Sequence, residues 1–182
     1  MKKAKSMIHL PIIVLEKGNE VNKIKDILFS QSKKKVLGFL LDEGGWFKGA
    51  KILLLKDIHN IGKDAVIIKN EGIIMSSTKM PEVQSILDDE FHPFHMEVID
   101  DRGNKIGFIE DILFDVQNGK IHSLEITEGV FDDLIHGRLK IPVSEEVAFE
   151  EKRIIVSAKY LRGIDKTGGI KKYFDKKDGK EG

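Results

Sequence analysis

The sequence of 182 residues contains no cysteine, so a disulfide framework, a thiolate metal site and a cysteine nucleophile are all excluded. It also lacks any apolar run near the ~20 residues that a membrane-spanning helix requires. A net charge is missing too, because 30 basic side chains balance 30 acidic ones. This balance argues against a uniformly basic nucleic-acid binder and against a wholly acidic disordered tail. The hydrophobic fraction of 41% is enough for a packed core.

The balanced total hides three regions of different charge. Residues 1–70 carry fourteen basic and seven acidic side chains, a net of +7, whereas residues 71–150 carry six and eighteen, a net of −12. Residues 151–182 carry ten and five, a net of +5. This division favours separate modules, and it allows them to attract one another within a chain or in a homo-oligomer.

The N-terminal segment resembles a signal peptide only superficially. Met1–Lys5 is basic and Met7–Leu15 is mostly apolar, but the apolar stretch is short and holds His9 and Pro11. No small-residue cleavage site follows it. We therefore expect a cytoplasmic protein.

One motif occurs twice, first at residue 18 and again at residue 103. Gly18–Phe29 (GNEVNKIKDILF) and Gly103–Phe114 (GNKIGFIEDILF) are identical at seven of twelve positions. The similarity continues to a shared Glu-Gly pair, Glu43-Gly44 and Glu128-Gly129. Two related units, at about 12–70 and 96–158, explain this pattern better than one continuous fold.

Each unit has the pattern of a β structure, with short apolar runs rich in Ile, Val, Leu and Phe between turn signals. The clearest turn signals are Gly18-Asn19, Gly103-Asn104 and Asn118-Gly119. The apolar alternation of the second copy changes phase beside Ser123, and Gly38 lies at the matching place of the first copy. Such a change predicts a β-bulge, which bends a strand as a small barrel requires. The predicted fold is mainly β, with two tandem small bent β-barrels.

The segments outside the two units lack this β pattern. Pro81 lies where the first turn of a helix would begin, and Met80, Val83 and Leu87 have helical spacing. We predict a short helix from about Pro81 to Asp89. The predicted domains are a first barrel (1–76), a linker with this helix (77–95), a second barrel (96–158) and a basic, partly disordered tail (159–182).

Asp26 and Asp111 occupy the same place in the repeated motif, and two carboxylates can indicate acid–base catalysis. Each belongs to its own unit, so a structural role, accepting backbone N–H bonds at a turn or bulge, is the favoured interpretation. The sequence has no phosphate-binding glycine loop and no nucleophile–base set. We expect no enzyme, no catalytic residue and no cofactor. The expected structural residues of the motif are Gly18, Asn19, Asp26, Gly103, Asn104 and Asp111.

The closest pair of histidines is His92 and His95, with Glu90 and Glu97 nearby. Pro93 between them prevents a regular helix face, and a closed metal site needs more ligands than this cluster offers. A linker pair without a metal is the favoured interpretation. A small metal-dependent enzyme centred on these residues is an alternative.

Two glycine-flanked loops carry the apolar side chains that we single out as candidate partner-binding residues, namely Trp46, Phe47, Phe131, Leu134 and Ile135. Aromatic side chains dominate the energetics of protein interfaces. Two interpretations remain open. The loops are anchors for a partner, or they fold over an open end of each barrel.

Lysine tracts at Lys33–Lys35 and in Lys171–Lys177 offer contacts to phosphate. Neither tract is interleaved with several aromatic residues, so stacking on nucleic-acid bases is not indicated. A solvated charged surface is the favoured interpretation.

In the second copy, the segment Gly103–Phe114 is followed by a basic and apolar strand that contains Ile141-Pro142. This combination resembles the PRC-barrel domain. The first copy departs from it with Asn22 in place of Gly107 and Leu53-Leu54 in place of Ile141-Pro142. The resemblance extends over both copies, and tandem copies of this kind resemble uncharacterised proteins of Gram-positive bacteria.

The resemblance implies a six-stranded, strongly bent β-barrel that serves as a docking module and has no catalytic residues. It therefore favours a non-enzymatic adaptor that binds another protein or itself. Similar domains occur in the photosynthetic reaction-centre H subunit and in a ribosome maturation factor. A ribosome- or RNA-associated assembly factor is thus an alternative, in which the basic first module approaches phosphate.

Overall fold

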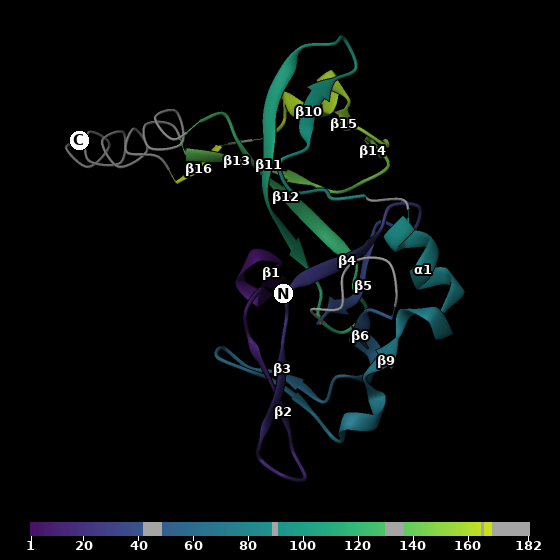
Figure 1. The fold of residues 1–182 in the computed structure, drawn as a ribbon. Helices are drawn as coiled ribbons and strands as arrows, with labels where there is room; N and C mark the ends of the chain where they lie inside the picture. The colour runs from purple at the N-terminus through teal and green to yellow at the C-terminus, as the bar shows by residue number, and fades with distance from the viewer. Residues whose placement is uncertain (42–48, 89–90, 130–136, 165, 169–182) are drawn as a thin grey trace, which may run out of the picture. The chain divides into compact units, whose positions relative to one another are not determined.

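The computed structural model describes residues 1–41, 49–88, 91–129, 137–164 and 166–168 (Figure 1). Within these ranges there are sixteen strands and only two α-helices, α1 (Pro81–Asp88) and α3 (Ala158–Leu161). The mainly β fold predicted from the sequence is confirmed.

The chain separates into two compact units. The first comprises Met1–Phe91 together with Phe114–Ile121, and the second comprises His92–Leu113 and His122–Gly182. The segment Phe114–Ile121 lies inside the second copy of the sequence repeat, yet its contacts group it with the first unit. The predicted domain boundaries stay predictions.

In the first unit, eight short strands form two sheets of four. The order β3-β2-β8-β7 joins Glu20–Lys23, Pro11–Val14, Val66–Ile68 and Asn60–Ile61. The order β4-β5-β6-β9 joins Asp26–Ser30, Lys35–Leu40, Lys51–Leu54 and Met75–Ser76. Strands β2 and β8 are parallel, and the other pairs in these sheets are antiparallel. Shorter elements are β1 (Lys2–Lys3) and the 3-10 turns η1 (Lys5–Met7), η2 (Leu55–Asp57), η3 (Glu71–Ile73) and η4 (Ser77–Lys79).

In the second unit, seven strands follow one another in the order β14-β15-β10-β11-β12-β13-β16. They span Val147–Phe149, Arg153–Val156, Glu97–Asp100, Lys105–Phe114, Ile121–Thr127, Gly137–Pro142 and Lys166–Gly168. Strands β10 and β15 are parallel, as β2 and β8 are in the first unit.

The two units share one strand order and one register. The series β7-β8-β2 corresponds to β14-β15-β10, and β5-β6 corresponds to β12-β13. Equivalent Cα partners face one another in both units: Gly38 and Leu54 correspond to Ser123 and Pro142, and Ile12 and Val66 correspond to Val98 and Ile154. The repeat seen in the sequence is therefore also a repeat of the hydrogen-bonded pairing.

Two features distinguish the copies. Strand β11 runs unbroken over ten residues, whereas Ile24-Lys25 divides the same stretch of the first copy into β3 and β4. The opening hairpins also differ in length: six residues separate Ile13 from its partner Glu20, but only five separate Ile99 from its partner Lys105.

The bulge predicted beside Gly38 is present in β5. Leu28 pairs with Gly38, but Phe29 pairs with Val36, which leaves Leu37 as the extra residue. A Cβ atom on Gly38 would lie 2.3 Å from the carbonyl oxygen of Leu53, so only glycine fits between β5 and β6 there.

The bulge predicted beside Ser123 in the second copy stays a prediction. Ser123 and Leu124 are consecutive in β12, and both are buried. Their pairing with Pro142 and Ile141 of β13 runs through both residues without a register shift. The buried Oγ of Ser123 has no hydrogen-bond partner among the described residues.

The predicted linker helix is α1, which the sequence placed at about Pro81 to Asp89 and the structure describes over Pro81–Asp88. Val83 and Leu87 are buried, at 3% and 6% exposure. They form one core cluster with Leu28, Leu40 and Ile52 of the β-strands and with Ala50, the residue before β6. The apolar stripe of α1 therefore belongs to the core of the first unit.

Candidate functional site

A groove of about 550 Å³ opens on the surface of the first unit, in the size range of ligand-binding clefts. Residues of β5, β6, η2, α1 and the segment Phe114–Ile121 line it. The lining residues are Lys33, Lys35, Val36, Leu37, Leu54, Leu55, Lys56, Met80, Pro81, Glu82, Val83, Gln117 and Asn118.

The floor of the groove is aliphatic. Val36, Leu55 and Val83 are buried, and they continue into the core. Leu37, Leu54 and Met80 are only partly buried and pack on the outside of the core cluster beneath α1. Leu37 is the extra residue of the β5 bulge. The bulge thus adds an apolar side chain to the floor.

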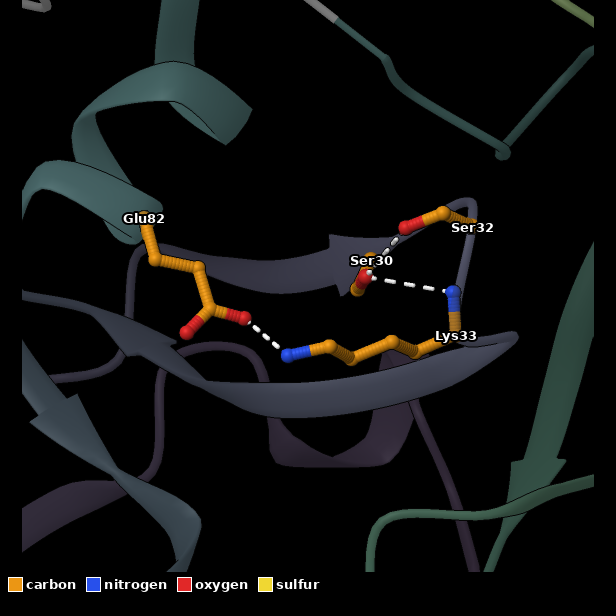
Figure 2. Close-up of polar contacts among 4 residues, drawn as sticks. All are labelled: Ser30, Ser32, Lys33 and Glu82. Atoms are coloured by element: carbon orange, nitrogen blue, oxygen red, sulfur yellow. Dashed lines mark hydrogen bonds and ion pairs between the residues drawn. The ribbon is translucent and has the colours of Figure 1, made fainter.

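One edge of the groove is closed by an ion pair. Figure 2 shows the Lys33 side chain reaching from the turn after β4 to Glu82 in the first turn of α1. Both side chains are more than half exposed, at 53% and 62%. The buried hydroxyl of Ser30 holds the turn, because its Oγ accepts a hydrogen bond from the Lys33 backbone N–H at 3.3 Å and lies 3.4 Å from Ser32 Oγ.

Two further lysines stand at the rim. Lys56 is exposed and Lys35 is half-buried. Neither is in an ion pair with any residue that the structure describes. Two ammonium groups beside the aliphatic floor are therefore available to a negatively charged ligand.

The segment Phe114–Ile121 contributes a hydrogen-bonded turn to the lining. Asp115 accepts hydrogen bonds from the Gln117 backbone N–H at 2.7 Å and from Asn118 Nδ2 at 3.1 Å. The Val36 backbone N–H donates to the carbonyl oxygen of Gly119 at 2.8 Å. Gly119 has φ +74, the left-handed conformation that favours glycine.

The five apolar loop residues singled out from the sequence, Trp46, Phe47, Phe131, Leu134 and Ile135, lie outside the described residues. Their role as partner anchors stays a prediction. Sequence reasoning missed the groove, although it identified the lysine tract that forms one rim and the helix that forms one wall. The one sequence signal for the groove is Leu37, an apolar residue at the predicted bulge. Its proximity to the lysine tract and to the helix arises only in the folded structure.

The repeated glycines lie in turns, whereas Asp26 begins β4 and Asp111 lies within β11. Gly18 and Gly103 have φ +67 and +86. Asp26 Oδ1 and Asp111 Oδ1 each accept a hydrogen bond from the next backbone N–H, both at 2.7 Å. Each carboxylate therefore makes a local bond to the backbone of its own strand.

Asn104 donates hydrogen bonds to the carboxylate of Asp100, a residue that was not among the candidates from the sequence. Asp100 accepts hydrogen bonds from Asn104 Nδ2 at 2.9 Å, from the Asn104 backbone N–H at 2.7 Å and from the Arg102 backbone N–H at 3.0 Å. The side-chain bond from Asn104 is the largest cause that holds the pKa of Asp100 below its ordinary value. The pair Asp100 and Asn104 closes the opening hairpin of the second unit.

Two histidines at equivalent places share an uncommon backbone. His9 and His95 have φ +70 and +64, and their N–H groups donate to the carbonyl oxygens of Ile24 and Ile109 at 2.7 and 2.8 Å. Both side chains are exposed. In the described part of the chain, no group of three His, Cys, Asp or Glu residues could hold a metal ion. The structure thus connects His95 with a repeated turn.

We expect His9→Gly and His95→Gly each to raise the free energy of unfolding by about 0.5–1 kcal/mol, because glycine adopts the left-handed conformation without strain. Urea denaturation of the full chain measures the change. Lys17→Gly is the control, since Lys17 is an exposed turn residue without a positive φ, and it should destabilise. If both histidine substitutions destabilised the protein, the histidine side chains would contribute more to stability than the relief of backbone strain by glycine.

A comparison with models of protein families shows which family the chain belongs to. The model of the PRC-barrel domain matches twice, at residues 1–72 and 92–162. The chain belongs to the PRC-barrel family. The prediction of two tandem PRC-barrel domains is confirmed, and domains of this family are protein-interaction modules.

No curated protein was found to match this tandem PRC-barrel chain. Among the helices that the structure describes, none is long and apolar enough to cross a membrane.

Proposed function

We propose that this tandem PRC-barrel protein is a non-enzymatic adaptor of the bacterial cytoplasm that binds another protein, and that the groove of the first unit is a docking surface. One observation carries the proposal: the side chains of Leu37, Leu54 and Met80 form an aliphatic floor that stays partly exposed. Apolar surface left open in a cleft gains free energy when a partner covers it.

The polar groups of the groove support binding rather than catalysis. Among its described lining residues, the titratable side chains are those of Lys33, Lys35, Lys56 and Glu82, and they are exposed or half-buried. Catalytic acids and bases are instead usually desolvated and face one another in a cleft.

The experiment compares Leu54→Asp with Leu15→Asp in the full chain. Leu54 lines the groove, whereas Leu15 is an apolar residue of the same unit that is 58% exposed and lies outside it. Immobilised wild type and both variants are incubated with lysate of the native cell, crosslinked, and the recovered proteins are quantified by mass spectrometry.

We expect the wild type and Leu15→Asp to recover at least one protein in equal amounts. With Leu54→Asp, the recovered amount of that protein should fall by about tenfold. The reason is that a carboxylate on the floor replaces a central apolar contact and would lose its hydration under the partner. A thermal melt of Leu54→Asp tests whether this variant is folded. Equal recovery of every protein by all three forms would exclude the groove as the docking surface.

A further inference from the structure

We propose that the occupant of the groove is a short, acidic, amphipathic peptide segment of a partner, whose aliphatic side chains lie on the floor and whose carboxylates pair with Lys35 and Lys56. This inference rests on the proposed function and names the chemistry of the partner.

The floor selects for aliphatic side chains. None of the thirteen lining residues within the described part of the chain is aromatic, and those of the floor are Val, Leu and Met. A floor of this kind offers dispersion contacts and desolvation to Leu, Ile, Val or Met side chains. Met80 adds a flexible wall that adjusts to side chains of different shape.

The rim selects for negative charge. Three lysines and one glutamate are among the lining residues that the structure describes, and the glutamate is already paired with Lys33. The excess positive charge therefore resides on Lys35 and Lys56. Carboxylates on a bound segment would pair with these ammonium groups beside the apolar floor. A partner that covers the floor excludes water from it and so strengthens the pairs relative to open water.

Nucleic acid fits this groove less well than an acidic peptide. A single strand binds by stacking its bases on aromatic side chains, and none is among the lining residues that the structure describes. Glu82 would also repel a phosphate placed near Lys33. A small metabolite is disfavoured as well, because sites for such ligands place a few polar groups inside the cleft, whereas here they stand at the rim.

The ion pair of Lys33 with Glu82 makes a distinctive prediction. In the free protein, Glu82 competes with the ligand for the Lys33 ammonium group. Glu82→Gln leaves the side-chain shape nearly unchanged but removes that competing charge. An acidic peptide should therefore bind this variant more tightly, by about twofold to fivefold, the effect of one exposed ion pair.

The test selects peptides from a displayed library of random twelve-residue sequences, with the immobilised full-length chain as the target. The sequences expected to be enriched combine Asp or Glu with Leu, Ile, Val or Met. A selected peptide is then synthesised with a fluorescent label, and its Kd is measured by anisotropy against wild type and variants.

Three variants decide the result. The double substitution Lys35→Glu with Lys56→Glu should weaken binding by about tenfold or more, since two favourable pairs become repulsive. The matched control, Lys63→Glu with Lys69→Glu, makes the same change in net charge at exposed lysines outside the groove, and it should change Kd by less than about threefold. Glu82→Gln should tighten binding. Higher salt should weaken binding to wild type.

Each other outcome overturns the inference in a defined way. Selected peptides that are neutral or basic, yet lose affinity with Leu54→Asp, would refute the acidic partner and leave the docking function standing. Peptides that bind wild type and Leu54→Asp equally, or no enriched peptide at all, would refute the groove itself.

Two further measurements test the other occupants. Binding of a labelled twelve-nucleotide RNA that depends on Lys35 and Lys56, without binding of acidic peptides, would assign the groove to nucleic acid. A dimer of the wild type in sedimentation equilibrium that dissociates in the double Lys→Glu variant would assign it to a second copy of the chain.

Discussion

Gly38→Ala is expected to lower the free energy of unfolding of the first unit by about 3 kcal/mol or more, at the upper end of overpacking effects. The new Cβ would lie 2.3 Å from the Leu53 carbonyl oxygen and 2.8 Å from Leu54 Cα. Both are backbone atoms of β6, so no side chain can rotate away to relieve the overlap. The strands β5 and β6 would have to separate, and the groove floor carried by Leu37 and Leu54 would separate with them.

Gly107→Ala introduces a similar backbone overlap in the second unit, at a position that corresponds to Asn22 in the first. Its Cβ would lie 2.4 Å from the Thr127 carbonyl oxygen, at a φ of +156. Hydrogen exchange by mass spectrometry distinguishes the two variants, because each should lose protection in the strands of its own unit. Gly163→Ala is the control, since its nearest atom is 3.7 Å away. If Gly38→Ala were as stable as Gly163→Ala, the close approach of β5 and β6 would be wrong.

Leu87→Ala should destabilise the first unit by about 2–4 kcal/mol, the usual cost of removing a buried leucine side chain. Leu87 is 6% exposed and anchors the last turn of α1 on the sheet. Weaker anchoring also displaces Met80, Glu82 and Val83, which form the helix side of the groove. Urea denaturation measures the stability, and the anisotropy assay measures the loss of peptide affinity.

Ser85→Ala is the control for the helix, because Ser85 is exposed on the same element and alanine is the better helix former. It should leave stability within about 0.5 kcal/mol of wild type. A Leu87→Ala variant as stable as Ser85→Ala would mean that α1 is not packed on the sheet as described.

Much of the fold could be predicted because its determinants are local or repeated. The recurrence of Gly18–Phe29 at Gly103–Phe114 predicted two units, and the two share one strand register. The place of Gly38 predicted a bulge that exists, and the spacing of Val83 and Leu87 predicted α1. Turns, glycines and helical periodicity are properties of neighbouring residues, so one sequence is enough to find them.

Other features depend on partners far away in the sequence. No turn-forming residue at Ile24-Lys25 indicates that the strand is divided there. His9 and His95 have left-handed backbone without the glycine that would predict it. Lys33–Lys35 looked like an ordinary solvated tract, because its proximity to Glu82 in α1 and to the Leu37 floor arises only on folding. The groove was missed for that reason.

The unequal opening hairpins have a practical consequence. Six residues connect Ile13 to its partner Glu20 and five connect Ile99 to Lys105, yet the strands on both sides keep equivalent partners. The tip of this hairpin thus accommodates a change of chain length without transmitting it to the sheet. A fluorophore-binding tag or an epitope inserted after Lys17 would report on the first unit while leaving its groove intact, since none of the groove's lining residues belongs to that hairpin.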